Sequence, residues 1–456
     1  MSDSQSESIY DVPHCPRPLD AVVRLPGSKS LTNRALIVSA LADGTSGLEG
    51  ALFCDDSRRL MTALTQLGYR VEADEEREFV EVHGGGAKPL LASESGIGCG
   101  QTPERVLDAG ASGTSMRFLT ALVTLGRGMY RIDGDARMRE RPIEPLLEAL
   151  RHLGADARSE RGNGCPPVRV AASGLRGGSV AIAGDVSSQF LSALLMVAPY
   201  ARGGVHIMVR GELVSRPYVE MTCALMQSFG ARVDVQPGDR YGISPTPYQA
   251  QAYRIEPDAS GSSYFMAAAA ICGGRVSIPG LSRDALQGDV HFADVLEQMG
   301  CGVQWRADGL EVTGPQSGLA GVDVDLRHMS DCLPTLAAIA PLASAPVRIR
   351  NVANTRLKET DRIAACADEL RRFGVTVQEH EDGLEIQPCP DLKTGVHVRT
   401  YADHRMAMAF AILGLRVPGT HILDPACVAK TFPGFFAKLE RTIADSHGSR
   451  NSSHVL

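Results

Sequence analysis

The 456-residue sequence lacks several features, and each absence excludes a class of protein. No apolar run approaches the length of a membrane span, which argues against a membrane-spanning chain. The eleven cysteines are scattered, with no Cys-x-x-Cys pair and no zinc-type spacing, so we expect reduced thiols and no metal site. A basic excess is also missing. The formal net charge of −7 argues against a nucleic-acid-binding protein.

The ends of the sequence give two further expectations. Residues 1–20 are polar and lack the apolar core of a signal peptide, which, with the reduced thiols, predicts a cytoplasmic protein. Residues 446–456 are polar and are predicted to form a disordered tail. Between them, a content of 44% hydrophobic and 22% charged residues is typical of globular domains, and the length predicts at least two.

The sequence contains six repeats of one α/β unit. One marker is a helix that ends in glycine and leads into a strand, and these glycines are Gly68, Gly154, Gly230, Gly300 and Gly374. The second marker is an apolar helix that begins with small polar or charged residues. Its copies start near Ser30, Ser115, Ser187, Gly261, Ser330 and Asp403. A short alternating strand is predicted after each, at Leu48–Ala51, Tyr130–Asp133, Val205–Val209, Val276–Ile278, Val347–Ile349 and Thr420–Leu423.

Each unit is therefore predicted to hold a buried helix, a strand, an amphipathic helix and one or two further strands. The first helices are apolar nearly all round, as in 190–197 and 265–272, so we expect them inside a bundle. Six units predict two pseudo-symmetric domains of three units each. The Pro-rich stretch 237–257 is the predicted boundary, with a second crossing after an N-terminal strand at 21–25. The predicted domains are 26–256 for the first three units and 1–25 plus 257–445 for the last three.

Cations gather where the buried helices start. Leu25–Arg34 reads Leu-Pro-Gly-Ser-Lys-Ser-Leu-Thr-Asn-Arg, so Lys29 lies at a helix start that Ser28 or Ser30 can cap. A helix N-terminus and nearby cations favour an anion such as phosphate. The stretch is no Walker-type P-loop, because Ser28 stands where that pattern needs glycine. The alternative is a capped surface helix with two solvated cations.

Three more helix starts and loops in the first half fit an anionic ligand. Gly110–Arg117 combines glycines, which allow close approach of a ligand, with amides and an arginine, although such runs are often only loops. Asp133–Pro142 carries three arginines, for which a solvated charge run is the alternative. Ser187–Gln189 offers three hydrogen-bonding side chains where a simple cap needs one, which suits sugar hydroxyls or phosphate.

The second half carries the densest charge. The segment 354–362 contains Lys358 and Arg362, which are four residues apart and would share one face of a helix. The alternative interpretation is an exposed helix held by salt bridges. Arg405 enters an otherwise apolar helix and therefore needs a desolvated anionic partner. His404 beside it has no metal-ligand spacing around it, and we interpret it as structural.

Together these segments resemble the 5-enolpyruvylshikimate-3-phosphate (EPSP) synthases, a family of enolpyruvyl transferases. The resemblance runs from Leu25 to about Leu439. Its most specific pieces, in the family's order, are Leu25–Arg34, Arg137–Pro142, Ser187–Phe190, Lys358–Arg362, Asp403–Met408 and Lys430–Pro433. It implies an α/β (α+β) fold of two domains that close on substrate. Each domain would have three βαβαββ-type repeats with buried parallel helices, an inside-out α/β barrel.

The resemblance implies transfer of the enolpyruvyl group of phosphoenolpyruvate to the 5-hydroxyl of shikimate 3-phosphate, a step of aromatic amino-acid biosynthesis that releases phosphate. The implied catalytic residues are Asp331 as general base, Glu359 and Lys430 near the protonated methylene, and Lys29; for Asp331 a helix cap is the alternative. The positions implied for shikimate 3-phosphate are Lys29, Ser30, Arg34, Ser187, Ser188, Gln189, Ser215, Asp331, Asn354 and Lys358. Those implied for phosphoenolpyruvate are Lys29, Gly113, Thr114, Arg137, Gln189, Arg362, Arg405 and Lys430. No metal or organic cofactor is implied, and we expect a monomer that contacts neither membrane nor nucleic acid.

The sequence departs from the family's pattern near the implied phosphoenolpyruvate pocket. Ala111-Ser112 stands where Asn-Ala is usual, and Phe118 where proline is common, which puts sensitivity to analogues such as glyphosate in question. One alternative is the sister transferase acting on UDP-N-acetylglucosamine, whose loop carries a reactive cysteine that Gly110–Arg117 lacks. The other is a non-catalytic phospho-sugar-binding protein, which would be expected to lose the acid and base residues.

Overall fold

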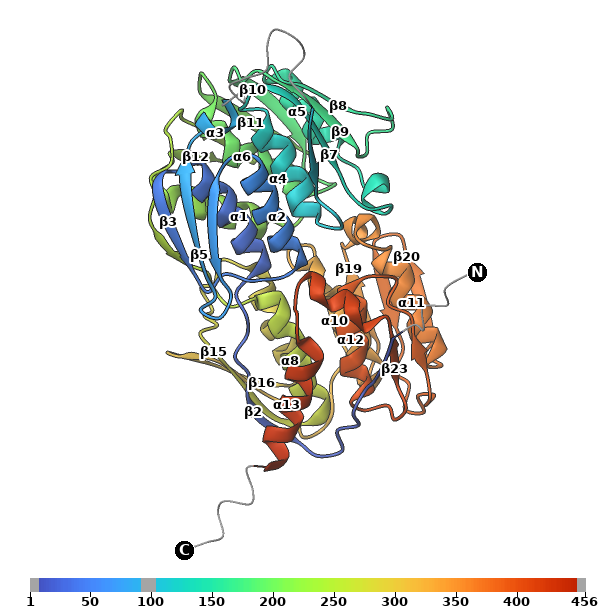
Figure 1. Ribbon diagram of the computed structural model, residues 1–456. Helices are drawn as coiled ribbons and strands as arrows, with labels where there is room; N and C mark the ends of the chain where they lie inside the picture. The colour runs from blue at the N-terminus through green and yellow to red at the C-terminus, as the bar shows by residue number, and fades with distance from the viewer. Residues whose placement is uncertain (1–7, 92–103, 449–456) are drawn as a thin grey trace, which may run out of the picture. The chain divides into compact units, whose positions relative to one another are not determined.

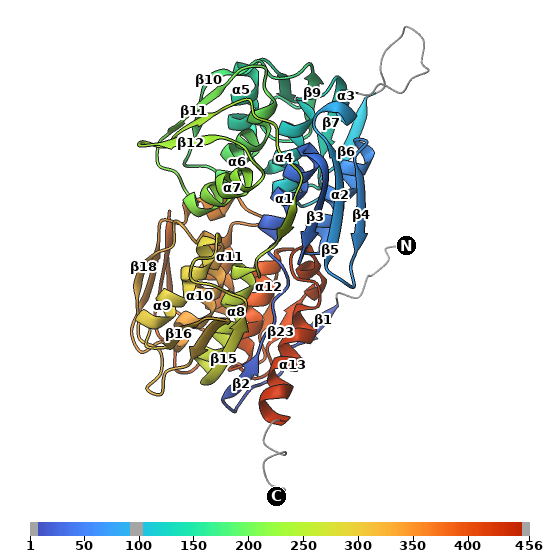
Figure 2. The same ribbon diagram turned by 90° about the vertical axis from the view of Figure 1, so that its left-hand side faces the viewer.

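The computed structural model describes residues 8–91 and 104–448. The chain divides into two compact units. The N-terminal unit is Gly27–Glu256, and the C-terminal unit combines Met1–Pro26 with Pro257–Leu456. Figures 1 and 2 show the helices and strands of each.

The N-terminal unit contains three copies of one pattern. In chain order its elements are α1 (Lys29–Leu41), β3 (Asp43–Glu49), α2 (Asp55–Gln66), β4 (Arg70–Asp74), β5 (Phe79–Gly85), α3 (Lys88–Leu91), β6 (Arg105–Asp108), α4 (Gly113–Val123), β7 (Gly128–Asp133), the 3-10 helix η1 (Met138–Glu140), α5 (Glu144–His152), β8 (Asp156–Ser159), β9 (Val168–Ala172), β10 (Gly178–Ala183), α6 (Ser188–Val197), η2 (Ala198–Tyr200), β11 (Val205–Arg210), α7 (Arg216–Ser228), β12 (Val233–Gln236), β13 (Arg240–Ile243) and β14 (Ala252–Arg254). They form three four-stranded sheets, ordered β14-β3-β5-β4, β6-β7-β9-β8 and β10-β11-β13-β12.

The C-terminal unit repeats the pattern. Its elements are β1 (Ile9–Asp11), β2 (Leu19–Val22), α8 (Ala259–Cys272), β15 (Gly274–Pro279), η3 (Gly288–His291), α9 (Phe292–Gln298), β16 (Gly302–Arg306), β17 (Gly309–Thr313), β18 (Asp323–Asp325), η4 (Ser330–Cys332), α10 (Leu333–Ile339), η5 (Ala340–Leu342), β19 (Val347–Arg350), η6 (Ala353–Leu357), α11 (Arg362–Arg372), β20 (Val377–His380), β21 (Gly383–Ile386), β22 (His397–Val398), α12 (His404–Gly414), β23 (His421–Leu423), η7 (Pro425–Lys430) and α13 (Phe435–Gly448). Their sheets are ordered β16-β17-β15-β2, β18-β19-β21-β20 and β1-β23-β22.

Every sheet contains a parallel pair of strands, and in most sheets a buried helix connects the two. Examples are β6 with β7 across α4, and β18 with β19 across α10, and the later strands of these sheets pair antiparallel. A parallel pair needs such a crossover connection, which is why the helix lies between the two strands in the chain. The predicted α/β fold of repeated units is confirmed. Among the described strands the sheets remain separate, so they do not form a closed barrel.

Two strands come from distant parts of the chain. β14 pairs in parallel with β3, so residues 252–254 complete the first repeat. β1 pairs antiparallel with β23 and completes the last. The stretch 237–257, interpreted from its prolines as a boundary, therefore contains β14 and all of β13 rather than irregular linker only.

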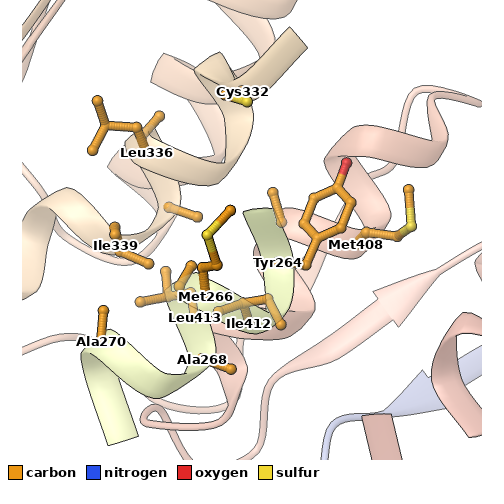
Figure 3. Close-up of a cluster of buried hydrophobic side chains, with 14 of the residues drawn as sticks. Tyr264, Met266, Ala268, Ala270, Cys332, Leu336, Ile339, Met408, Ile412 and Leu413 are labelled. Atoms are coloured by element: carbon orange, nitrogen blue, oxygen red, sulfur yellow. The ribbon is translucent and has the colours of Figure 1, made fainter. Parts of the chain in front are cut away.

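Burial follows the predicted pattern. All eleven residues of α4 are buried, as are eleven of thirteen in α1, so these helices lie inside the unit rather than on its surface. In the C-terminal unit α8, α10 and α12 pack together. Figure 3 shows Met266 of α8, Leu336 of α10 and Leu413 of α12 within one apolar cluster. Consequently the helix N-termini, where the sequence places its cations, are positioned by rigid cores.

The end of the chain differs from the predicted tail. Helix α13 continues to Gly448, and Ser446 is buried and accepts a hydrogen bond from the Asp20 amide (3.0 Å). The prediction of a tail from residue 446 is thus wrong at its start, and residues 449–456 lie outside the described part. Within the described ranges, the helices are too short or too polar to cross a membrane.

Candidate functional site

The residues predicted for the site are divided between the two units. Gly27–Glu256 carries Lys29, Ser30, Arg34, Gly113, Thr114, Arg137, Ser187, Ser188, Gln189 and Ser215, and the C-terminal unit carries Asp331, Asn354, Lys358, Glu359, Arg362, Arg405 and Lys430. Most of them lie at or beside helix starts, where unpaired backbone amides favour negative charge. Arg34 lies inside α1, and Lys358 and Lys430 lie at the ends of η6 and η7.

Arg362 is the centre of a charged cluster in the C-terminal unit. It begins α11, which Asp361 caps. Its Nε and Nη2 donate to the two oxygens of Asp403 (2.8 and 3.2 Å). Nη1 donates to Asp331 Oδ1 (2.9 Å), and Nη2 also donates to Glu359 Oε2 (3.0 Å). Burial lowers the pKa of Arg362, but the three carboxylates outweigh it and raise the pKa above its ordinary value. The guanidinium stays charged with 2% of the side chain exposed.

Asp331 is held by two arginines rather than used as a cap. Its Oδ2 accepts from Arg405 Nη2 (2.6 Å), while Oδ1 accepts from Arg362 and lies 3.7 Å from Lys358 Nζ. Neither η4 nor α10 has a side-chain cap bond, so the alternative of Asp331 as helix cap is wrong. The carboxylate is 18% exposed, which leaves part of it reachable from solvent.

Glu359 joins Arg362 to Lys430. Its Oε1 accepts from Lys430 Nζ (2.7 Å), and its Oε2 accepts from Arg362. Both partners of the Glu359–Lys430 pair are largely buried, at 13% and 8% exposure. Lys430 ends η7, a segment that follows the last strand of the sixth repeat. Two carboxylates, Asp331 and Glu359, are therefore bridged by one guanidinium, and each has its own further cation.

Lys358 and Arg362 converge, but not in the predicted way. Lys358 follows the 3-10 helix η6, and α11 begins only at Arg362, so the two do not share a helix face. Both nevertheless reach Asp331 Oδ1. The alternative of an exposed salt-bridged helix is also wrong, because Arg362 is buried. Asn354, within η6, is buried and donates to Ser330 Oγ (3.4 Å).

Two residues of this cluster were not selected from the sequence. Asp403 caps α12 and holds Arg362, so a cap residue doubles as a counter-ion. Tyr264 accepts a long hydrogen bond from Arg405 Nη1 (3.4 Å), and burial raises its pKa, so its hydroxyl stays protonated. The Asp-His-Arg run beside a helix start is the only signal that could have found Asp403. Nothing in the sequence near Tyr264 indicates its role.

His404, interpreted as structural, is buried beside this cluster. Neither ring nitrogen forms a hydrogen bond within the described part of the chain, although Nδ1 lies 3.5 Å from Asp403 Oδ1. Burial and the charge of Lys430 hold the pKa of the imidazole well below its ordinary range. The side chain is therefore neutral, and it contributes no charge to the cluster.

In the N-terminal unit Arg34 is enclosed by polar neutral groups. Its Nε donates to Thr222 Oγ1 (2.7 Å), and Nη2 donates to Ser192 Oγ and the Tyr218 carbonyl (3.2 Å each). Nη1 donates to the Ser30 carbonyl (3.0 Å). Burial lowers its pKa to about 10. Among the described residues Arg34 has no carboxylate partner, and its enclosure differs from the solvated cation of the alternative interpretation.

Lys29 opens the same helix. Ser28 rather than Ser30 caps α1, accepting from the Leu31 amide (3.3 Å). Lys29 Nζ lies 3.3 Å from the buried Asp56 Oδ2, and 14% of its side chain is exposed. Asp56, which no sequence pattern singles out, comes from the first turn of α2. The pair fixes the ammonium at the N-terminus of α1.

Gly113 opens α4 beside a buried arginine. A Cβ at this position would lie 2.7 Å from Arg141 Nη2, so a larger residue would require that guanidinium to shift. Arg141 is 5% exposed, and no sequence pattern separates it from its neighbours in the arginine run. Thr114 Oγ1 accepts from Asn33 (2.8 Å), which ties the starts of α1 and α4 together. Arg137, by contrast, is 38% exposed and pairs with Glu140 (2.9 Å).

Helices α6 and α7 present hydroxyl groups. Ser187 caps α6 by accepting from the Gln189 amide (3.3 Å), whereas Ser188 is buried and Gln189 half-buried in its first turn. Ser215 precedes α7 in the left-handed conformation (φ 52°) and caps nothing with its side chain. Only one of the three predicted residues at α6 is therefore used by the cap.

The departures from the family pattern have structural roles here. Ser112 caps α4, accepting from the Ser115 amide (3.2 Å). Phe118 lies beside Arg34, with the guanidinium carbon 5.4 Å from the ring centroid, so its ring contacts an uncompensated cation.

A separate group could in principle hold a metal ion. Glu72, Glu81 and His83 have ligand atoms within 4.8 Å of one another, the one such group found in the described part of the chain. They lie on strands β4 and β5, away from the helix starts, and Glu72 already pairs with Arg70.

Comparisons with known proteins support one family. A family model described as EPSP synthase (3-phosphoshikimate 1-carboxyvinyltransferase) matches residues 13–439. The 3-phosphoshikimate 1-carboxyvinyltransferase of Nostoc punctiforme is 48% identical over 432 residues, 94% of this chain and 97% of that protein. The protein of the same name from Shewanella baltica is 45% identical over 422 residues, 91% and 95% of the two chains.

Solved structures agree with this. The EPSP synthase of Acinetobacter baumannii superposes with a TM-score of 0.77 at 25% identity, over 96% of this chain and 98% of that one. The enolpyruvyl transferase NikO of Streptomyces tendae has a TM-score of 0.72 over 95% and 96% of the two chains. At 19% identity the second likeness concerns the fold alone.

Proposed function

The chain belongs to the EPSP synthase family, and from this premise we propose how its residues perform the reaction. The enzyme transfers the enolpyruvyl group of phosphoenolpyruvate to the 5-hydroxyl of shikimate 3-phosphate and releases phosphate. The relatives' names support this acceptor rather than UDP-N-acetylglucosamine. We assign a role to each side chain of the site from its partners and its burial.

The cluster of two carboxylates bridged by Arg362 is the observation that carries the proposal. Asp331 is the general base that accepts the proton of the 5-hydroxyl as the oxygen attacks C2 of phosphoenolpyruvate. Its two arginine bonds fix the carboxylate in one orientation, and its 18% exposure leaves it accessible to the hydroxyl. A base held in one orientation loses no entropy in finding its proton.

Glu359 and Lys430 serve the methylene carbon. In the addition step a proton must reach C3, and in the elimination step a proton must leave C3 as the bond between C2 and the phosphate oxygen breaks. The 2.7 Å hydrogen bond between Glu359 and Lys430 allows the pair to hold a proton on either partner. One pair can therefore supply the proton in the first step and recover it in the second.

The cations bind the anionic groups of the substrates. Arg405, together with Lys430, Lys29 and Arg137, is assigned to phosphoenolpyruvate, whose carboxylate and phosphate match the planar fork of arginine. Arg362 is assigned to the same substrate through its charge, because its three nitrogens already donate to carboxylates. Gly113, Thr114 and Gln189 are assigned to the same substrate. Shikimate 3-phosphate is assigned to Lys29, Ser30, Ser187, Ser188, Gln189, Ser215, Asp331, Asn354 and Lys358.

Arg34 is assigned a different part from the one the resemblance implied. All three of its nitrogens already donate to protein groups, so a direct bond to shikimate 3-phosphate would have to share or displace one of them. Its charge is uncompensated within the described residues, and a buried charge without a counter-ion is costly. We therefore assign it the electrostatic stabilisation of a bound anion near the start of α1.

We further propose the cofactor requirement, oligomeric state and location of the enzyme. Cations supply the charge stabilisation that a metal would otherwise give, so we propose that the reaction needs no cofactor. We also propose that the enzyme acts as a monomer in the cytoplasm. The buried Cys332 beside Asp331 is no nucleophile in this scheme, because burial raises its pKa well above the ordinary value.

Phosphate release tests the function directly. With phosphoenolpyruvate present, we expect release to require shikimate 3-phosphate and not to occur with UDP-N-acetylglucosamine. Release with the nucleotide sugar alone would reverse the assignment. Tight binding of shikimate 3-phosphate without any turnover would instead support the non-catalytic alternative.

A further inference from the structure

The N-terminal unit carries a groove of about 610 Å³ that shares no residue with the proposed active site. It lies on the outward face of the sheet β10-β11-β13-β12, and residues of α5 line one side of it. On β11 the side chains alternate, so Ile207 is buried while His206 and Met208 face outward. Its volume is within the range typical of small-molecule sites.

The floor of the groove combines short side chains with the taller His206 and Met208. The strand register aligns Ser179, His206 and Gly242 in one row across the sheet. In the next row Ala181 lies beside Met208, which is 43% exposed. Short side chains on either side of taller ones leave a flat hollow, suited to a planar apolar group.

Gly242 has no structural reason to be glycine. It lies inside β13, its φ is outside the left-handed range, and an added Cβ would meet only ordinary contacts, at 3.6 Å from Asp234 and 3.7 Å from His206. A glycine within a strand weakens the strand, and it often marks close approach by a ligand. The glycine here keeps the centre of the hollow open.

Positive charge borders the floor. Arg240 lies opposite Met208 in the register, and Arg210 is two residues beyond Met208 on β11, so the two arginines are diagonal neighbours. Neither forms an ion pair within the described ranges, and the nearby Asp239 is already paired with Arg216. Like charges at this spacing repel unless an anion lies between them.

Helix α5 contributes one imidazole ring and one carboxylate to the lining. His152 of α5 lines the groove and is anchored through Nδ1 by the Glu148 carbonyl (2.9 Å). Glu148 is the one carboxylate among the lining residues, so two arginines outweigh it. Inorganic phosphate would use the arginines but leave the apolar floor unfilled, whereas an uncharged ring would leave the arginines unpaired.

We propose that this groove binds a small aromatic carboxylate, with its ring on the floor around Gly242 and its carboxylate between Arg210 and Arg240. Each guanidinium can donate two parallel hydrogen bonds to a carboxylate. The site is independent of the transfer reaction, so its occupation need not compete with either substrate.

Calorimetric titration of the full chain with 2-naphthoate tests the proposal, with saturating shikimate 3-phosphate present to occupy the active site. We expect one-to-one binding that weakens at least tenfold for the neutral isostere 2-naphthamide, because a charge-assisted hydrogen bond is worth about that factor or more. Inorganic phosphate should bind at least tenfold more weakly than 2-naphthoate.

Three variants localise the site. The double change Arg210→Gln with Arg240→Gln, and separately Gly242→Leu, should each weaken 2-naphthoate binding at least tenfold. Arg232→Gln, which removes an exposed arginine of the same repeat outside the groove, should leave binding unchanged. All variants should keep phosphate-release turnover within about twofold, which separates this proposal from the proposed function. Absence of saturable binding, or equal affinity in the double variant and the Arg232→Gln control, would overturn it.

Discussion

The two units stabilise their buried arginines in opposite ways. In the C-terminal unit Arg362 and Arg405 contact carboxylates of the protein itself, and three acids surround Arg362 alone. In the N-terminal unit Arg34 is just as buried, yet hydroxyls and carbonyls are its partners. In the proposed mechanism the first group is organised before substrate arrives, as acid–base chemistry requires, whereas the charge of Arg34 is left for an incoming anion.

The largest effect is expected for Asp331→Asn. An amide keeps the shape of the side chain but cannot accept the proton of the 5-hydroxyl, so turnover should fall by roughly 10²–10⁴. Steady-state phosphate release measures this.

The same change removes a counter-ion from Arg362 and Arg405. We therefore expect a lower free energy of unfolding, by about 1–3 kcal/mol, the cost of leaving buried polar groups underpaired. Asp325→Asn, an exposed carboxylate of the same unit, is the control and should leave turnover unchanged. If Asp331→Asn kept a turnover close to that of the parent, Asp331 would not be the general base.

Changes at two arginines should separate a direct binding role from an electrostatic one. Arg405→Lys keeps the charge but loses the planar fork, so phosphoenolpyruvate binding should weaken by about 1–3 kcal/mol while shikimate 3-phosphate binding hardly changes. Arg34→Gln, which removes the charge assigned an electrostatic role, should weaken mainly shikimate 3-phosphate, whereas Arg34→Lys keeps that charge and should have a smaller effect. Binding is measured by titration calorimetry of each substrate. If Arg405→Lys and Arg34→Gln weakened both substrates equally, the roles assigned to these two arginines would be wrong.

Acid sensitivity should arise in the C-terminal unit. His404 has a folded-state pKa well below that of the unfolded chain, so below about pH 6.5 the unfolded state binds more protons. Stability from this residue is therefore complete above that pH and falls as the pH decreases, with a slope of up to about 1.4 kcal/mol per pH unit.

Denaturant unfolding between pH 5 and 7.5 tests this slope. The variant His404→Gln, which cannot titrate, should lose less stability on acidification than the parent. His206→Gln, at an exposed histidine of the N-terminal unit, is the matched control and should follow the parent. Identical slopes for His404→Gln and the parent would contradict the neutral state of His404.

The smallest effect concerns Arg137. Because its pair with Glu140 is exposed, Arg137→Gln should change the free energy of unfolding by less than about 0.5 kcal/mol. Arg141→Gln, at a buried position four residues away, should cost more, about 1–3 kcal/mol. Thermal unfolding of the two variants gives the comparison, and equal losses would show that exposure does not distinguish these arginines.

Much of the fold could be predicted because single residues determine it locally. All five glycines expected to close helices have positive φ, from 86° at Gly230 to 98° at Gly154. Apolar composition on every face correctly predicted which helices are buried.

The predicted ends of the strands were less accurate. The N-terminal strand covers Leu19–Val22 rather than residues 21–25, and β3 begins at Asp43, because pairing with β5 extends it beyond its alternating part.

The site shows the limit more clearly. Charge at helix starts could be recognised along the sequence, so Lys29, Arg362 and Arg405 were all found. The partner of each cation could not be predicted from the sequence. Asp331, Asp403 and Arg362 come from three different elements, and only the packed core brings them together. The same holds for Asp56, which is distinguished only by its distance to Lys29.

The most direct test compares one residue from each unit in the same experiment. Single-turnover rates and shikimate 3-phosphate affinity should be measured for Asp331→Asn and for Ser188→Ala, which removes a buried hydroxyl at the start of α6. We expect Asp331→Asn to lower the rate of the chemical step by roughly 10²–10⁴ with affinity within about threefold of the parent. Ser188→Ala should mainly weaken binding, by about 0.5–1.5 kcal/mol. If Asp331→Asn instead lost affinity in proportion to rate, Asp331 would act through substrate binding alone, and the assignment of proton transfer to the C-terminal unit would be contradicted.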